Sequence, residues 1–368
     1  MKEIYLSLLR AALWKQKPAP LQLSETEWNS LLLLNAQQGT GPLVYPMLLE
    51  QEDVPEVVRM QMKSVCISTI QQQVHLQHTL EQAWTALEKA DLRPVLMKGA
   101  GLAALYPTPQ QRTWGDIDLF VGKYGYHSAC AVMRDTFPGA LKFDEELDHY
   151  KHYNLIADGI SIEIHRVSIG FQHPIDEYKY RNIEAYGMCP LCVEKEDING
   201  LRVKVPESTF NLLFILLHSW EHAISQGANL RQCCDLAYLL YRRCYDPTPL
   251  RDWLCSLHVM DVWRIYMYIL VNYLGLPEQE AMFYKNNEDI KLRAERFLDD
   301  LLNGRLVAPK PAAQAPSNRF VRKFHTMQDR WRNAQRIAAY SPAYARHMKA
   351  ETLLHGALRL FAKDRHWE

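Results

Sequence analysis

The chain has 368 residues, and its 42 Lys and Arg are balanced by 42 Asp and Glu. This length allows two or three domains, and a hydrophobic fraction of 48% is ample for buried cores. Zero net charge provides no overall field that would favour nucleic acid or an anionic membrane. No signal-peptide pattern opens the chain, and the longest apolar stretch, 262–276, is too short to span a bilayer. We therefore expect a cytoplasmic protein without a transmembrane segment.

The eight cysteines do not form the dense framework of a small disulfide-stabilised protein. Cys189 and Cys192 make up the sole Cys-x-x-C pattern, and no second pair follows at zinc-finger spacing. We expect eight free thiols, with zinc bound at Cys189 and Cys192 as the alternative.

Residues 1–90 have a helical pattern. Ser24 followed by Glu27 predicts a capping box at the start of one helix. From Val54 to Ala90 there are few helix breakers, which predicts one long helix or two consecutive ones. We interpret the apolar face of this segment as a packing surface. It consists of Ile67, Ile70, Val74, Leu80 and Leu87.

Residues 91–205 differ from the helical region before them, because their pattern predicts strands as well as helices. Asp158-Gly159 is a strong type I′ turn pattern and predicts a hairpin between the strands on either side of it. Short helices are expected at 100–106 and 126–137. Together these elements predict a mixed sheet with helices on one face, which is an α+β arrangement. The predicted strands are 94–97, 116–121, 153–157 and 160–167.

The rest of the chain is predicted to be mainly helical. Residues 206–302 show helical apolar spacing, with helices expected at Ser208–Ala223, Asn229–Arg243 and Trp253–Leu274. Residues 303–317 are rich in Pro and Ala and predict a linker. Residues 318–368 form a basic amphipathic segment, which either packs on the rest of the protein or contacts a membrane surface or a partner.

Three acidic residues stand out in the predicted sheet. Asp116 and Asp118 open one strand, and the period of two residues directs both carboxylates to the same face. Glu163 lies at the centre of an alternating strand. Carboxylates on neighbouring strands make a hard-oxygen pocket suited to Mg²⁺ held together with phosphates. Such a pocket is typical of phosphoryl or nucleotidyl transfer.

The order of motifs around these acids is distinctive. It runs from Leu96-Met97-Lys98-Gly99-Ala100 and Leu105-Tyr106-Pro107 through Arg112 and 116–121 to Ile162-Glu163-Ile164-His165. In this order the chain resembles the uncharacterised nucleotidyltransferase family of bacteria, within the polymerase-β-like nucleotidyltransferase superfamily. The likeness covers about 36–240, continues through 216–218 and 235–236, and weakens toward the C-terminus.

The resemblance implies a nucleotidyltransferase-type mixed sheet with helices, flanked by N- and C-terminal helical regions. It also implies an enzyme that moves an NMP from an NTP to a hydroxyl group and releases pyrophosphate. The acceptor would be a small molecule, a sugar derivative or a protein, because the neutral charge argues against nucleic acid. Asp116, Asp118 and Glu163 would be the catalytic ligands of Mg²⁺, or of Mn²⁺ as the alternative ion. Glu163 would also help take the proton of the acceptor.

Three further residues are candidates for binding the nucleotide. Lys98-Gly99 stands where the superfamily usually has Gly-Ser, which suggests that Lys98 supplies charge while Gly99 lets backbone amides approach a phosphate. Arg112 either binds phosphate or pairs with an acid. His165 has either a role near the phosphates or a purely structural one. The resemblance places His218 and Asp235 at the border of the cleft.

A competing motif lies in the helical region. His218, Glu221 and His222 form H-x-x-E-H, a pattern in which two imidazoles on one helix face bind zinc and the glutamate acts as base. A zinc-dependent hydrolase is therefore an alternative function. A non-catalytic nucleotide-binding module is a second alternative. The acceptor, the preferred NTP and the oligomeric state stay open at this stage.

Overall fold

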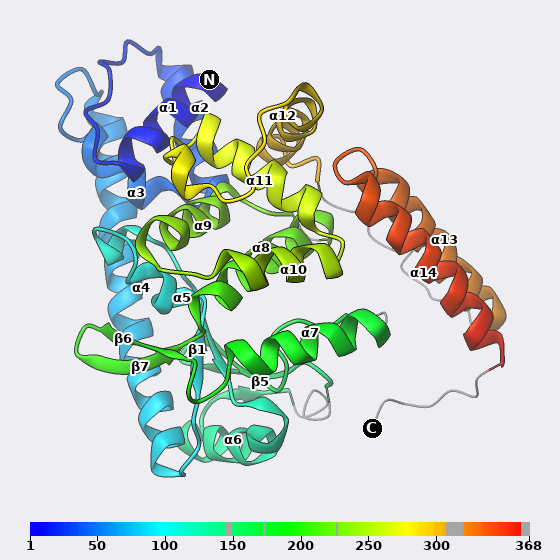
Figure 1. Cartoon of the computed structure of the whole chain (residues 1–368). Helices are drawn as coiled ribbons and strands as arrows, with labels where there is room; N and C mark the ends of the chain where they lie inside the picture. Colours follow the sequence, from blue (N-terminus) through cyan, green and yellow to red (C-terminus); the bar gives the residue numbers. More distant parts are fainter. Residues whose placement is uncertain (144–148, 172–173, 226, 307–318, 362–368) are drawn as a thin grey trace.

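The structure is a computed structural model that describes residues 1–143, 149–171, 174–225, 227–306 and 319–361. Most of the predicted linker and the last residues of the basic segment lie outside these ranges. No helix in the described ranges is long and apolar enough to cross a membrane. The chain combines a mixed sheet with many helices and is therefore α+β, as predicted (Figure 1).

A five-stranded mixed sheet is the centre of the fold, with the strand order β1-β2-β5-β4-β3. β2 pairs in parallel with β5, whereas the other neighbours pair antiparallel. In the hairpin of β4 and β5, both turn residues have positive φ, 49° for Asp158 and 79° for Gly159, which confirms the predicted turn. The strands are β1 (Val95–Met97), β2 (Asp116–Phe120), β3 (Leu141–Lys142), β4 (His152–Ala157) and β5 (Ile160–His165).

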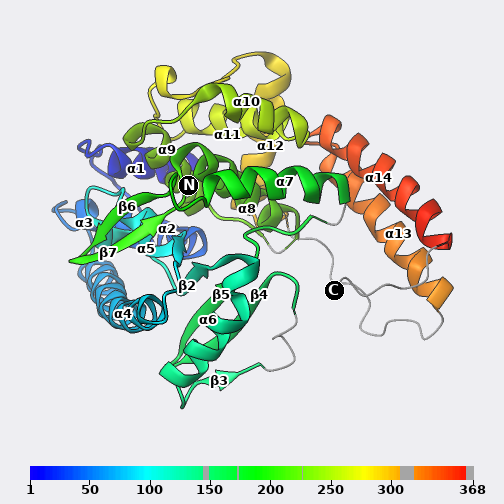
Figure 2. The same ribbon diagram turned by 60° about the horizontal axis from the view of Figure 1, so that its bottom comes forward.

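One face of this sheet packs on two helices, α4 (Glu56–Lys89) and α6 (Gly122–Thr136) (Figure 2). Ile117 and Leu119 of β2 are fully buried in the hydrophobic cluster on that side. Because side chains alternate along a strand, Asp116 and Asp118 face the opposite side of the sheet. Strand alternation therefore directs these carboxylates away from the core that α4 and α6 cover.

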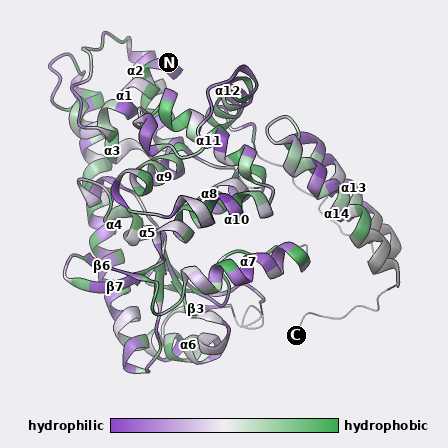
Figure 3. Cartoon of the chain, viewed as in Figure 1, coloured by the Kyte–Doolittle hydropathy of each residue, from purple (hydrophilic) through white to green (hydrophobic). Residues whose placement is uncertain are grey.

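The predicted packing surface on α4 is only partly confirmed. A single helix spans the segment, but Ile67, Ile70 and Val74 are exposed to 56%, 47% and 67%. Leu80 and Leu87, farther along the same helix, are fully buried against the sheet. The prediction is wrong for Ile67, Ile70 and Val74, because the first half of the helix is buried on a different face, through Val58 and Met62 of the main hydrophobic cluster. Figure 3 shows hydrophobic and hydrophilic residues mixed along α4.

The N-terminal helices are α1 (Lys2–Leu13), α2 (Glu25–Gln38) and α3 (Gly41–Leu48). α2 begins with the predicted capping box between Ser24 and Glu27. These three helices share one hydrophobic cluster with the helices that follow residue 205. The boundaries predicted near residues 90 and 205 remain predictions. The helical regions that precede and follow the sheet in the sequence pack together.

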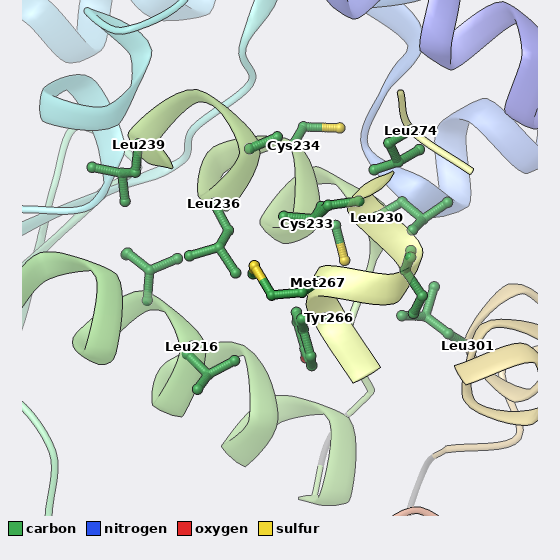
Figure 4. Packing of buried hydrophobic residues seen from close by; sticks show 14 of the residues in the cluster. Leu216, Leu230, Cys233, Cys234, Leu236, Leu239, Tyr266, Met267, Leu274 and Leu301 are labelled. Atoms are coloured by element: carbon green, nitrogen blue, oxygen red, sulfur yellow. The ribbon is translucent and has the colours of Figure 1, made fainter. Parts of the chain in front are cut away.

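The second helical region forms a layer above the sheet. Figure 4 shows Leu236 and Cys233 of α9 pointing into the space between α8 and α11. The predicted helix Trp253–Leu274 is wrong in one respect, since it is two helices separated at His258, whose φ of 60° is not helical. The helices are α8 (Ser208–Ser225), α9 (Leu230–Arg242), α10 (Pro247–Ser256), α11 (Met260–Asn272) and α12 (Glu288–Leu302).

Several further elements complete the described chain. A hairpin of β6 (Glu194–Ile198) and β7 (Leu201–Val205) and helix α7 (Pro174–Gly187) were not predicted from the sequence. The short helix α5 (Gly99–Ala103) follows β1, and the 3-10 turns Pro109–Gln111 and Glu278–Glu280 lie in connecting segments. The predicted basic segment forms a hairpin of α13 (Arg319–Ile337) and α14 (Pro342–Phe361). Ile337, Tyr340 and Ala345 join the main hydrophobic cluster, so the hairpin packs on the protein, as one of the two alternatives predicted.

We expect Leu236→Ala to lower the free energy of unfolding by about 2–5 kcal/mol, because it leaves a cavity in a fully buried site between helices. Urea denaturation measures the change. Leu292→Ala is the matched control, because Leu292 on α12 is 59% exposed and its removal should change stability by less than about 0.5 kcal/mol. Equal effects of the two substitutions would contradict the packing described for α9.

Candidate active site

The three predicted acids converge on one side of the sheet. β2 and β5 pair in parallel with Asp118 directly opposite Glu163, and Asp116 lies two residues earlier on the same face. One carboxylate oxygen from each of the three lies within 4.8 Å of the others. The convergence follows from register alone, because adjacent residues of paired strands point in the same direction.

These carboxylates fit a hard divalent cation. Asp118 is fully buried, and its Oδ2 atom has no hydrogen-bond partner among the described residues. An ionised oxygen buried without a donor is costly, so the site provides a position that a cation would stabilise. Three carboxylate groups match the preference of Mg²⁺ and Mn²⁺ for oxygen ligands.

Lys98 supplies the nearest positive charge of the protein itself. Its Nζ lies 2.9 Å from Asp118 Oδ1, and its side chain is only 14% exposed. Burial opposes the charged form, but the carboxylates of Asp118, Asp116 and Glu163 raise the pKa of Lys98. The residue has a φ of 52°, an uncommon conformation for a residue other than glycine, at the turn between β1 and α5. Strain of this kind clusters at functional sites.

His165 connects two of the acids. Its Nε2 lies 3.0 Å from Asp118 Oδ1 and 3.1 Å from Glu163 Oε2, while Nδ1 lies 3.3 Å from the carbonyl oxygen of Val167. Because both ring nitrogens face acceptors, the imidazolium form can donate to all of them. Burial disfavours that charge, but the two carboxylates raise the pKa of His165. His165 therefore holds the carboxylates in place, one of the roles left open by the sequence.

The pKa values of the three acids are shifted in different directions. Repulsion from Asp118, followed by burial, raises the pKa of Asp116. Burial acts against ionisation of Asp118 and Glu163, yet Lys98 and His165 hold the pKa of Asp118 well below its usual range, and His165 also lowers that of Glu163. Ionised carboxylates are the form that ligates a metal ion.

Arg112 is paired with an acid instead of standing free. Its Nε and Nη2 donate to the two oxygens of Asp235 at 2.6 and 2.8 Å, and Nη1 donates to the carbonyl of Gly99 at 3.0 Å. The hydroxyl of Tyr106 donates to the same carboxylate at 2.8 Å. Asp235 of α9 thus reaches the loop before β2. This buried network holds the Lys98-Gly99 turn against α9.

A cleft of about 360 Å³ lies between the sheet and helices α8 and α9. It brings together the predicted residues of the site and several that were not predicted. Lys98, Gly99, Arg112, Asp116, Glu163, His165, His218 and Asp235 line it, and Asp118 lies beneath them. The unpredicted lining residues that carry charge or titrate are Lys151, His152 and Arg231.

His152 could have been found from the sequence. The Asp158-Gly159 turn fixes the register of β4 and β5, and counting outward from it places His152 opposite His165. Its Nε2 lies 3.9 Å from Glu163 Oε2, and burial, the largest of several effects, lowers the pKa of His152 to about 4. Arg231 had no such pattern, because it enters the cleft through the packing of α9. Its Nη1 donates to Thr113 Oγ1 at 2.9 Å.

Comparison with known proteins shows a family match that includes the residues of this cleft. The family model described as uncharacterised nucleotidyltransferase matches residues 24–265, which contain all three acids and both helices that wall the cleft. The chain belongs to the uncharacterised nucleotidyltransferase family. It is thus a nucleotidyltransferase by family, and this confirms the resemblance read from its motifs.

Other comparisons add little to this assignment. The chain is 17% identical to an antigenic nucleotidyltransferase-like protein from Paracoccidioides brasiliensis of known crystal structure. The match covers 48% of this chain and 84% of that one, with a TM-score of 0.32. At this level the likeness indicates nothing about substrate. No protein of curated function matches the chain.

The H-x-x-E-H helix borders the cleft of this nucleotidyltransferase. In the described part of the chain, His218, Glu221 and His222 belong to none of the clusters of potential metal ligands whose atoms converge. Those clusters are Asp116-Asp118-Glu163, His152-Glu163-His165 and Asp176-His347-Glu351. The rings of His218 and His222 pack edge to face at 4.4 Å, and burial, the largest effect, lowers the pKa of both. Among the described residues, no third ligand joins these two imidazoles, as a zinc hydrolase would require. Cys189 and Cys192 are likewise free thiols outside these clusters.

We expect Asp235→Asn to reduce the free energy of unfolding by about 3–5 kcal/mol, because it leaves the buried Arg112 guanidinium without its counter-charge at nearly unchanged volume. Denaturant unfolding measures the loss. Asp289→Asn serves as the control, since Asp289 pairs with Arg293 but is 63% exposed, and the change should cost less than about 1 kcal/mol. A small effect of Asp235→Asn would show that Arg112 finds another partner.

Proposed function

We propose that the protein is an Mg²⁺-dependent nucleotidyltransferase of the cytoplasm. It moves an NMP from an NTP to a hydroxyl group of a small molecule, a sugar derivative or a protein, and pyrophosphate leaves. The convergence of Asp116, Asp118 and Glu163 in the cleft is the observation that carries this proposal. Three hard-oxygen groups beside a buried lysine suit a metal-bound triphosphate better than any other ligand class.

In this proposal Asp116, Asp118 and Glu163 hold the Mg²⁺, or Mn²⁺ as the alternative ion. When bound, such an ion lowers the pKa of the attacking hydroxyl and neutralises charge on the leaving pyrophosphate. His165 positions two of the carboxylates through its Nε2. The lowered pKa of Glu163 assigns it to ligation more than to proton transfer.

The positively charged side chains of the cleft are assigned either to substrate binding or to positioning other residues. Lys98 faces the acids at the floor of the cleft and is assigned to the phosphates of the nucleotide, next to the Gly99 turn. Arg112 is a positioning residue, because its guanidinium is occupied by Asp235 and the Gly99 carbonyl. Arg231 of α9 and Lys151, next to β4, also line the cleft and are candidates for contacts with the substrates.

The direct test is incubation of the purified protein with each α-labelled NTP, Mg²⁺ and cell extract, followed by a search for a labelled product. Transfer of label from one NTP onto an extract component supports the proposal and identifies the acceptor class. Tight binding of NTP without any labelled product in any extract would instead support a non-catalytic nucleotide-binding module.

We expect the affinities for Mg²⁺ and NTP to be strongly linked. Because Mg²⁺ is usually bound through few carboxylates together with substrate phosphates, the protein alone should bind it weakly, and NTP should tighten that binding. Calorimetric titration of NTP with and without Mg²⁺ measures the linkage. An NTP affinity that is indifferent to Mg²⁺ would refute the assigned metal site.

We expect Asp118→Asn to reduce the transfer rate by more than about a hundredfold while the fold stays intact, since changes to residues that merely support a metal ligand already cost 10–100-fold. Labelled-product formation gives the rate, and circular dichroism checks the fold. The matched control is Asp158→Asn at the distant hairpin turn, where asparagine also tolerates a positive φ.

His222→Ala separates this mechanism from zinc chemistry on the H-x-x-E-H helix. It should retain most of the activity, because His222 lies in the wall of the cleft and not in the acid cluster. Loss of all activity in His222→Ala, together with an active Asp118→Asn, would overturn the nucleotidyltransferase mechanism.

A further inference from the structure

A second cluster of ligating side chains lies outside the cleft. Asp176 is in the first turn of α7, and His347 and Glu351 are one turn apart on α14. His347 Nε2 lies 2.6 Å from Asp176 Oδ2 and 2.8 Å from Glu351 Oε1. Figures 1 and 2 show the hairpin of α13 and α14 beside the end of α7. The cluster therefore joins two helices that are far apart in the sequence.

The surroundings of the cluster are partly buried but reachable by solvent. Asp176 is 5% exposed, and its Oδ1 has no hydrogen-bond partner among the described residues, with Lys179 Nζ 3.6 Å away. His347 and Glu351 are each 19% exposed at the side chain. The cluster lines a cavity of about 310 Å³ between α7, α8 and the α13–α14 hairpin, which gives an ion a path to the ligands.

Two acids and an imidazole share this small site, with the ring of His347 between the carboxylates of Asp176 and Glu351. A second imidazole, that of His258, lies with its ring centre 4.0 Å from that of His347. The cations beside the acids are Lys179, 3.6 Å from Asp176, and Arg330, which lines the same cavity. A divalent cation held by both carboxylates would reduce the repulsion between them.

The ligand atoms of the cluster favour one class of metal ion over another. An imidazole nitrogen between two carboxylates suits zinc and similar transition metals, whereas Mg²⁺ and Ca²⁺ are bound through oxygen. Ligand atoms around a tetrahedral zinc with bonds of about 2.0–2.1 Å are roughly 3.3 Å apart. The ligand atoms of the cluster all lie within 4.8 Å of one another, so small side-chain rotations produce that spacing.

We propose that Asp176, His347 and Glu351 form a zinc-type metal site that clamps the C-terminal helical hairpin to α7. The hairpin is otherwise attached by Ile337, Tyr340 and Ala345 in the core and by Arg336, which donates to carbonyls of Leu306 and Ile224. The site shares no ligand with the acid cluster of the cleft, although Glu221 and Ser225 of α8 line both cavities. Its role is to stabilise the position of the hairpin on the protein.

The experiment measures zinc binding to the metal-free full-length protein by calorimetry and metal analysis after dialysis, with Mg²⁺ present in excess to occupy the acid cluster. The wild-type protein should retain a stoichiometric zinc ion, and its thermal midpoint should rise on zinc addition, because the ion binds the folded state. His347→Ala and Glu351→Gln should each lose at least about tenfold in zinc affinity and lose the thermal shift.

Two controls locate the ion. His325→Ala, at an exposed histidine on α13, and Asp118→Asn, in the cleft, should both bind zinc as the wild-type protein does. Absence of retained zinc in the wild-type protein would overturn the proposal and leave a pair of carboxyl groups that share a proton. Zinc affinity unchanged in both His347→Ala and Glu351→Gln would also overturn it, because the ion would then lie elsewhere.

Discussion

The parallel pairing of β2 with β5 is the constraint on which the candidate active site depends. It sets Asp118 opposite Glu163, and the alternation of β2 adds Asp116 to the same face. Three carboxylates so close together would repel one another strongly without positive charge nearby. Lys98 and His165 supply that charge, and each makes contact with Asp118 at 3.0 Å or less. The acid cluster and its two cations are therefore one electrostatic unit.

The rest of the fold serves to hold this unit at the floor of a cleft. Buried side chains of α4 and α6 fix the sheet from one side, so that the acids are left on the other. On the other side, Asp235 of α9 binds Arg112, and Arg112 donates to the carbonyl of Gly99. These bonds fix the turn that contains Lys98. The buried pair contributes little net stability by itself, because burying both charges is costly, but it specifies how the helical layer docks on the sheet.

The helical layer also gives the cleft its second wall. α8 presents His218, Glu221 and His222 toward the acids, and α9 adds Arg231. The residues of the H-x-x-E-H motif therefore line the cleft, and burial, the largest effect, lowers the pKa of both imidazoles. Beside a second cavity that α8 also lines, His347 of the C-terminal hairpin contacts Asp176 of α7.

The sequence by itself determined the features that depend on local periodicity. Alternation in 116–121 and 160–165 placed the three acids on one face, and Asp158-Gly159 determined the hairpin and, by counting, the register that brings His152 to His165. It did not reveal where long side chains find their partners. Arg112 pairs with Asp235 and His347 with Asp176 across more than a hundred residues, because these contacts arise from how helices dock. The same reason explains why Ile67, Ile70 and Val74 of α4 are exposed, since amphipathic spacing shows that a face is apolar but not whether another element covers it.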